Sequence, residues 1–169
     1  SDVCSSDLGL LEHRKRPDFI LKNLSGLLQR NSNLHLVFLG DGYMRKSLEK
    51  AVVDLQIINN THFMGFVEEI EKWISGSDLL ILASTFEGFP QVALQAAACG
   101  TPIVAMPLEE YEGAIFIRQV NQTESLPEIV SKVIKTEIPV KNLNDLLLYD
   151  WHDENINICH QDFLNLALI

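Results

Sequence analysis

Short, almost wholly apolar runs recur along the chain and predict strands buried on both faces of a sheet. The clearest three are LHLVFLG at 34–40, DLLILAS at 78–84 and PIVAM at 102–106. Three weaker runs follow the same logic, at 9–11, 61–65 and 114–117.

The segments between these runs place apolar residues at helical spacing. PDFILKNLSGLLQRN begins with Pro17, which suits the first turn of a helix because that turn needs no N–H there. Further helices are expected at 44–56, 68–77, 90–99 and 125–135, and in the tail from about Asp150. Strands alternating with helices predict an α/β fold, a Rossmann-like parallel sheet with helices on both faces.

In such a sheet, ligands bind beyond the carboxyl ends of the strands. That rule selects the loops after Leu11, Leu39, Met64 and Ser84. The first loop, EHRKRP at 12–17, carries three consecutive cations in an otherwise acidic chain. Two interpretations stay open for it: a clamp for phosphate, or the solvated start of a helix.

The second loop, LGDGY at 39–43, ends a strand and opens a helix. Gly40 and Gly42 would let a ligand approach the main chain closely. The loop lacks the third glycine of the dinucleotide fingerprint, so on its own an ordinary tight turn is the better interpretation.

The loop after Ser84 contains FEGFPQVALQ, where Pro90 stands near the start of a helix. The free N–H groups of a helix start attract anions. Glu87 does not suit a phosphate, but its oxygens accept hydrogen bonds from hydroxyls, which a sugar offers. Gln91 and Gln95 are one helical turn apart and share a face.

Composition removes several classes of function. A net charge of −10 argues against a general nucleic-acid binder, which needs basic surface. The chain shows no D-x-D pair, G-x-S-x-G elbow or G-x-x-x-x-G-K-[ST] loop, and its histidines and three cysteines have no metal spacing. No apolar run approaches the length of a transmembrane helix, so we expect no transmembrane segment.

The first eight residues, SDVCSSDL, have no structural pattern and back-translate to the end of a common sequencing adapter. We therefore expect residues 1–8 not to be native. The fold prediction starts at residue 9, with a first strand that is truncated.

Together the motifs resemble the C-terminal, nucleotide-sugar-binding domain of the retaining glycosyltransferases of family four (glycosyl transferases group 1), which have the two-domain GT-B architecture. The resemblance rests on GLLEHRKRPD, LVFLGDGYMRKSLEKAVVDL, THFMGFVEEIEKWISGSDLLILAS and, most specifically, FEGFPQVALQAAACGTPIVA. It implies that residues 9–169 are the donor domain, that an acceptor domain precedes them, and that this piece alone does not turn over.

The resemblance also implies roles for individual residues. Lys15 falls on the lysine that contacts the donor diphosphate, and Glu87 falls on the first acid of the E-x7-E pair, near the sugar hydroxyls. Both are the expected catalytic residues. The remaining expected donor contacts are Arg14, Gly40, Gly42, Gly65, Phe66, Val67, Gly88, Phe89, Pro90, Gln91 and Gln95.

The implied reaction is transfer of a hexosyl group from a nucleotide sugar to an acceptor hydroxyl with retention, without a metal or another cofactor. The expected partners are the nucleotide-sugar donor and a glycan or lipid-linked acceptor, with no nucleic acid. Polysaccharide biosynthesis in the cytoplasm is the family-level expectation, with peripheral attachment at the inner membrane face left open.

The sequence departs from the family pattern at Leu10, which replaces an arginine, at Gln95, which replaces the second glutamate, and in PLEEYEGAIFI after the fifth strand. An amide offers one acceptor oxygen, so ribose binding should weaken by about 1–2 kcal/mol, and Gln95→Glu should bind nucleotide more tightly. The alternative is a non-catalytic, degenerate sugar-nucleotide-binding module or partner subunit. Another GT-B enzyme, such as an epimerase, fits the E-G-F-P segment less well.

Overall fold

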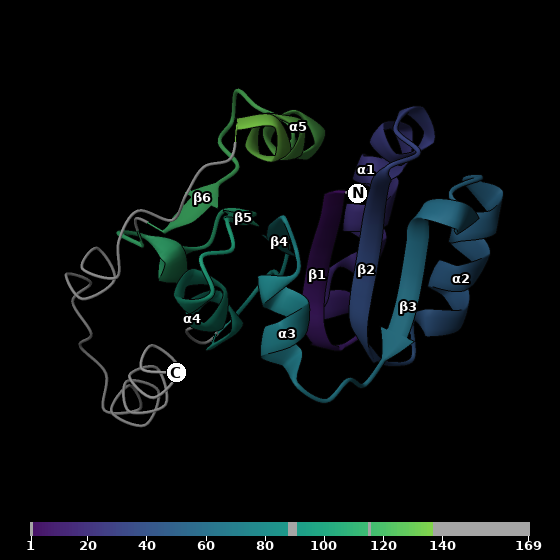
Figure 1. The fold of residues 1–169 in the computed structure, drawn as a ribbon, viewed down its shortest axis with the longest axis horizontal. Coiled ribbons are helices and arrows are strands. Elements are labelled where there is room, and N and C mark those ends of the chain that lie inside the picture. The colour runs from purple at the N-terminus through teal and green to yellow at the C-terminus, as the bar shows by residue number, and fades with distance from the viewer. Residues whose placement is uncertain (1, 88–90, 115, 137–169) are drawn as a thin grey trace.

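The computed structural model describes residues 2–87, 91–114 and 116–136. Strands and helices alternate along this part of the chain (Figure 1). The strands are β1 (Asp2–Leu10), β2 (Leu34–Asp41), β3 (Thr61–Gly65), β4 (Leu79–Leu82), β5 (Ile103–Ala105) and β6 (Ile117–Gln119). The helices are α1 (Pro17–Arg30), α2 (Arg45–Asp54), α3 (Ile70–Ser75), α4 (Gln91–Ala98) and α5 (Leu126–Thr136).

The strands form one parallel sheet in the order β3-β2-β1-β4-β5-β6. Their carboxyl ends share one edge, which β3 reaches at the lower end of Figure 1. The strand order reverses between β1 and β4, and the helices α1 and α4 that follow these two strands pack on opposite faces of the sheet. In open α/β sheets, such a reversal is where ligands bind. The predicted parallel α/β sheet is confirmed.

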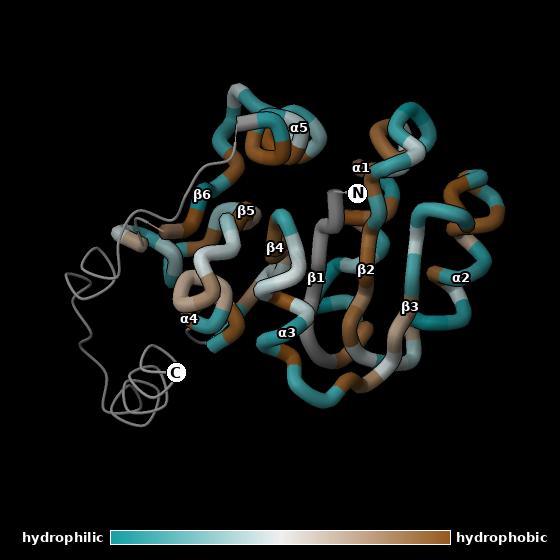
Figure 2. Tube along the Cα trace, viewed as in Figure 1, coloured by the Kyte–Doolittle hydropathy of each residue, from teal (hydrophilic) through white to brown (hydrophobic). Residues whose placement is uncertain are grey.

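Two apolar cores lie on opposite faces of the sheet. On one face α1, α2 and α5 pack over a cluster that includes Leu24, Phe38 and Ile129. On the other face α3 and α4 pack over β4 and β5. Figure 2 shows the hydrophobic residues running along β2, which contributes Leu36 and Phe38 to the first core.

Most predicted elements agree with the structure within two residues, but the strand predicted at 114–117 is wrong. Ala114 and Phe116 are buried in a turn, where the N–H of Ile117 donates to the carbonyl of Ala114, and β6 begins only at Ile117. Apolar side chains that face a core from a turn give the same pattern as a short strand. The predicted tail helix lies outside the described residues.

The first strand is longer than predicted. Only residues 9–11 were expected to form a strand end, whereas β1 runs over Asp2–Leu10 and pairs with both β2 and β4. Strand pairing uses the main chain, so a segment without an apolar pattern can still occupy a central position. That residues 1–8 are not native stays a prediction.

The loop after β2 packs against the end of β1 without any intervening side chain. A Cβ added at Gly42 would lie 2.5 Å from the carbonyl oxygen of Leu11. The N–H of Met44 donates to that same oxygen, and the N–H of Leu11 donates to the carbonyl of Asp41. Gly42 is therefore required by the packing of two main chains, and its predicted contact with a ligand stays a prediction.

Gly42→Ala should destabilise the fold by about 1–3 kcal/mol, because the new methyl group collides with main chain that cannot rotate away. Urea unfolding measures this difference. Gly26→Ala is the control: it lies inside α1, where its Cβ meets only the flexible end of Arg30, 3.4 Å away. Alanine there should leave stability unchanged or raise it. Equal effects of the two substitutions would contradict the packing account.

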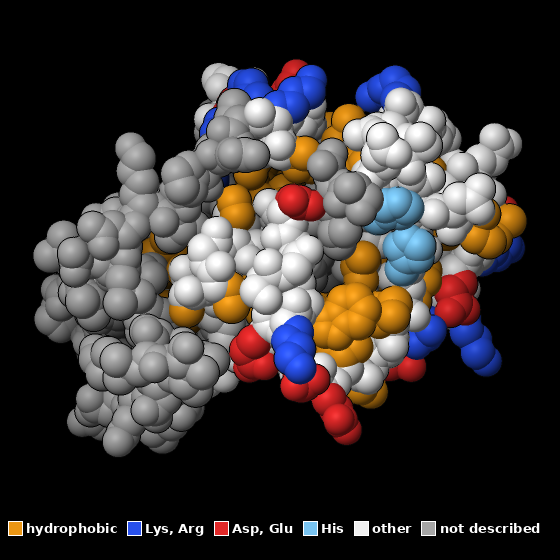
Figure 3. All heavy atoms as spheres, viewed as in Figure 1, with side chains coloured by type: hydrophobic (Ala, Val, Ile, Leu, Met, Phe, Trp, Pro, Cys, Tyr) orange, Lys and Arg blue, Asp and Glu red, His pale blue; other side chains and the backbone are white. Residues whose placement is uncertain are grey.

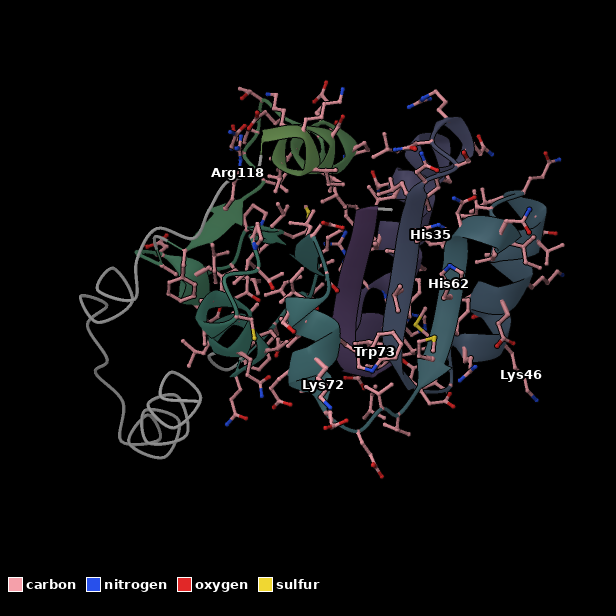
Figure 4. The ribbon with its side chains drawn as sticks, viewed as in Figure 1. His35, Lys46, His62, Lys72, Trp73 and Arg118 are labelled. Carbon is pink, nitrogen blue, oxygen red and sulfur yellow. The ribbon has the colours of Figure 1, made fainter. Side chains whose placement is uncertain are left out.

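His35 and His62 face each other across β2 and β3 (Figures 3 and 4). Nδ1 of His35 lies 3.0 Å from Nε2 of His62, so one ring donates a hydrogen bond to the other. Burial, and then the charge of His35, lower the pKa of His62. The pair thus favours a neutral His62 in the folded chain.

Because the pKa of His62 is lower in the folded chain, this site stabilises the fold above the unfolded value of about 6.5 and loses that contribution as pH falls through it. His62→Gln should therefore lose less stability between pH 7.5 and pH 5 than the unsubstituted chain. Urea unfolding at both pH values measures this. An identical loss in both proteins would mean that His62 titrates normally.

Candidate active site at the carboxyl edge of the sheet

Lys15 and Glu87 form an ion pair where β1 and β4 end. Lys15 closes the short helical turn His13–Lys15 after β1, and Glu87 follows β4. Nζ of Lys15 lies 2.6 Å from Oε1 of Glu87. The two residues are 72 positions apart, and they meet because β1 and β4 are neighbours in the sheet.

Two further side chains complete the contacts of Glu87. The hydroxyl of Ser84 donates to Oε1 at 2.6 Å, and Nη1 of Arg14 lies 3.2 Å from Oε2. Arg14 also pairs with Glu12, at 3.0 Å through Nε. Among the described residues, Oε1 thus has one neutral and one charged donor, and Oε2 has one charged donor.

The main chains of the two loops are also joined. The N–H of Thr85 donates to the carbonyl of Arg14 at 2.9 Å, and Nη1 of Arg14 donates to the carbonyl of Phe86 at 3.0 Å. Arg16 adopts the left-handed conformation, with φ of 53°, which is uncommon for a residue with a side chain. Its guanidinium stacks over the ring of Phe19, 4.1 Å from the centroid.

The cations Lys15 and Arg14 differ in how deeply their side chains are buried. The side chains of Lys15 and Glu87 are 11% and 13% exposed, whereas that of Arg14 is 42% exposed. The interpretation of this loop as a solvated helix start is therefore wrong for Lys15. An ammonium group so poorly hydrated needs a partner, and the partner here is Glu87.

The environment keeps Glu87 ionised. Burial by itself raises the pKa of this carboxyl group. The hydrogen bonds from Lys15 and Ser84, together with the charges of Lys15 and Arg14, outweigh burial and hold the pKa below its ordinary value. An ionised carboxylate is thus already in place in the free chain, where it can interact with a charged or hydroxyl-bearing ligand.

The loops after β2 and β3 form the next part of the same edge. Arg45 joins the strands that precede these loops, since Nη1 lies 3.1 Å from Asp41 at the end of β2 and Nη2 donates to the carbonyl of Phe63 in β3 at 3.1 Å. Gly40 and Gly65 have φ of 127° and 72°, a region that favours glycine. Both glycines are thus explained by the irregular pairing at the ends of β2 and β3, where the register shifts, as well as by the predicted ligand contact.

Several large apolar side chains are exposed in the loops along this edge. Their exposed fractions are 55% for Leu10, 69% for Tyr43, 75% for Phe66 and 64% for Phe86. Each belongs to the end of a different strand or to the loop that follows it. Such residues suit a face that binds a ligand or another part of a protein.

The other predicted residues divide between described and undescribed positions. Gln91 and Gln95 lie on α4 as predicted, and Val67 lies in the loop before α3. Gly88, Phe89 and Pro90 are outside the described residues. Ser84 was not predicted, because a lone serine at a strand end gives no signal of its own, even though its partner Glu87 is only three residues away.

Two further observations concern the described residues alone. No group of three or more His, Cys, Asp or Glu side chains among them is placed to hold a metal ion. The helices in the described ranges are all too short or too polar to cross a membrane.

The Lys15–Glu87 pair should couple strongly in unfolding experiments at pH 7. Glu87→Gln leaves a buried ammonium group short of a charged partner and should cost about 1–3 kcal/mol, as should Lys15→Met. The double variant should lose less than the sum of the two. The control pair is Lys72 and Glu69, equally close at 2.6 Å but 73% and 65% exposed, which should couple more weakly. Additive losses at Lys15 and Glu87 would contradict the paired geometry.

Comparison with known proteins places this geometry in a family. The family model "Glycosyl transferases group 1" matches residues 7–136. An uncharacterized glycosyltransferase of Methanocaldococcus jannaschii is 33% identical over 99 residues, which are 57% of this chain and 25% of that relative. The chain therefore spans about a quarter of that relative's length.

Solved structures share the fold. The C-terminal domain of a glycosyl transferase group 1 family protein (LpcC) from Francisella tularensis has a TM-score of 0.70 at 19% identity, over 80% of this chain and 76% of that one. Anabaena Alr3699/HepE in complex with UDP-glucose has a TM-score of 0.73 at 20% identity, over 99% of this chain and 49% of that one. The sheet order, the helices on both faces and the match over residues 7–136 lead to one conclusion: the chain belongs to the glycosyl transferases group 1 family and has the fold of a GT-B C-terminal domain.

Proposed function

We propose that this chain is the donor-binding half of a family-four enzyme that transfers a hexosyl group from a nucleotide sugar to an acceptor hydroxyl with retention of configuration. Membership of the glycosyl transferases group 1 supports the reaction class. The complex of a structural neighbour with UDP-glucose supports a nucleotide-sugar donor.

The observation that carries the proposal is the buried Lys15–Glu87 pair at the point where the strand order reverses. A departing nucleoside diphosphate needs positive charge at the bond that breaks, and this proposal supplies it from side chains and oriented N–H groups without a metal. Lys15 is a compact cation in a poorly hydrated site, where its field is strong. Arg14 adds a second cation at the solvent side.

Glu87 has two roles in the proposal, one for each oxygen. Oε1 accepts hydrogen bonds from Lys15 and Ser84 and thereby holds the ammonium group of Lys15 in place. Oε2 pairs with Arg14, whose side chain is more exposed than that of Lys15. Oε2 is therefore the oxygen that a sugar hydroxyl of the donor can reach, because a carboxylate accepts several hydrogen bonds.

The remaining predicted contacts fit the same placement. The loop Gly65–Val67 follows β3 on the side of the sheet beyond β1, where we propose that it contacts the base. The exposed side chains of Tyr43 and Phe86 lie at the same edge, which we propose faces an acceptor domain that binds a glycan or lipid-linked acceptor. Residues 9–169 would then be one half of a two-domain enzyme.

A second candidate function has support from Leu10. This side chain is 55% exposed at the end of β1. The family pattern has an arginine at this position, which contacts the diphosphate. An apolar residue there leaves fewer cations for the leaving group. A non-catalytic module that still binds sugar nucleotides fits this observation.

Calorimetry of the 169-residue chain with UDP and with GDP tests the proposal. We expect weak binding of at least one of them at millimolar concentration. Lys15→Met and Arg14→Met should each weaken it about tenfold, since each removes a charge-assisted contact to phosphate. Lys22→Met, on the exposed face of α1, is the control and should bind normally.

Absence of heat with both nucleotides would contradict the proposal, as would unchanged binding in both the Lys15 and the Arg14 variants. Sugar transfer by the longer protein separates the two candidates. Binding together with turnover supports the enzyme, whereas binding without turnover supports the non-catalytic module.

A further inference from the structure

Helices α3 and α4 lie side by side (Figure 1), and three polar contacts join α3 to α4 and to the residues that directly follow α4. Nε2 of Gln95 donates to Oε1 of Glu71 at 3.4 Å. Sγ of Cys99 lies 3.9 Å from the carbonyl oxygen of Glu71, and the hydroxyl of Thr101 donates to the carbonyl of Ile74 at 2.8 Å. The two helices therefore hold Glu71 opposite Gln95.

Gln95 matches its neighbour by carrying an amide. A glutamate at position 95 would bring a second negative carboxylate into contact with Glu71, which costs free energy when both are ionised. The amide nitrogen of Gln95 instead donates to that carboxylate. The contact between the two helices therefore contains one carboxylate, that of Glu71 on α3, and one amide, that of Gln95 on α4.

Glu71 stands between two segments of the candidate active site. It lies in the first turn of α3, shortly after the loop Gly65–Val67, and faces the helix that begins just beyond Glu87. Lys72 and Trp73, which follow it on α3, are labelled in Figure 4. The charge of Glu71 adds to burial in raising the pKa of Cys99, in agreement with a negative group facing α4.

The carboxylate of Glu71 has capacity left for a ligand. Within the described residues, Gln95 is the one side chain that donates a hydrogen bond to it. A carboxylate offers about four acceptor positions and no donor, so its natural further partners are hydroxyl or amine groups. The residue is half-buried, which strengthens a hydrogen bond to an ionised acceptor.

We propose that Glu71 binds the ribose hydroxyls of the nucleotide, with Gln95 as the positioning residue that orients its carboxylate. This inference rests on the proposed function. Two neighbouring hydroxyls of one sugar ring can both donate to a carboxylate, which fits the open acceptor positions of Glu71. The proposal also reverses an expectation from the sequence, because Gln95→Glu would now repel Glu71 and should weaken binding.

Calorimetry with UDP and GDP on four chains tests this: the unsubstituted chain, Glu71→Gln, Gln95→Glu and the double variant that exchanges the two groups. Each single variant should bind about tenfold more weakly, since it loses either the carboxylate or its neutral neighbour. The double variant has one carboxylate and one amide again, and its affinity should return to within about threefold of the unsubstituted value.

Two controls make the result specific. Pyrophosphate has no ribose, so its affinity should be the same for the unsubstituted chain and for Glu71→Gln. Glu68→Gln removes the same charge from an exposed position nearby and should leave UDP and GDP binding unchanged. Thermal unfolding checks that each variant is folded.

The outcomes separate this inference from the proposed function. If the unsubstituted chain binds a nucleotide and Glu71→Gln binds it equally well, the inference is wrong and the proposed function stands. Tighter binding by Gln95→Glu would likewise overturn it, because the useful carboxylate would then belong on α4. If the unsubstituted chain binds neither nucleotide, the proposed function itself fails.

Discussion

The arrangement of this edge depends on one buried ion pair, Lys15 with Glu87. Both side chains are largely buried, and burying a charge without a partner costs free energy, so each stabilises the other. Their contact ties the loop after β1 to the loop after β4, and the hydrogen bond from Thr85 to the carbonyl of Arg14 repeats that tie in the main chain. The two loops are thereby held together before any ligand arrives.

The sheet makes this pairing possible. Parallel strands in the order β3-β2-β1-β4-β5-β6 bring the end of the first strand beside the end of the fourth. The close packing of Gly42 on Leu11 then holds the loop after β2 against the same strand end. We propose that the polar groups assembled there bind the diphosphate, ribose and sugar of one nucleotide sugar.

Much of this was predictable from local pattern. Strands such as 34–40 and 78–84 follow from apolar runs, whereas Lys15 and Glu87 were singled out by the resemblance to a family pattern. Their contact depends on the order of the strands in the sheet. The sequence predicts a parallel sheet but not that order. Glu71 was not predicted, because its partner is set by how α3 and α4 pack in three dimensions. Ser84 was not predicted either, because a lone serine gives no signal in the sequence, although its partner Glu87 is three residues away.

The change in the interpretation of Gln95 has the same origin. Taken alone, an amide in place of a carboxylate predicts a weakened site. With Glu71 facing it from α3, the same amide keeps a single negative charge at that position. A carboxylate that is missing from one helix can thus be supplied by a neighbouring helix. Only the packing of the two helices distinguishes a carboxylate supplied in this way from one that is lost.

The most direct test of the central claim is an NMR titration of the backbone amides of this chain with UDP and GDP. The account predicts that the shift changes gather at the carboxyl edge, in residues 11–15, 40–43, 65–67 and 84–87. Changes gathered at the opposite edge, in residues 31–33 and 76–78, would contradict it, and so would the absence of any change at saturating nucleotide.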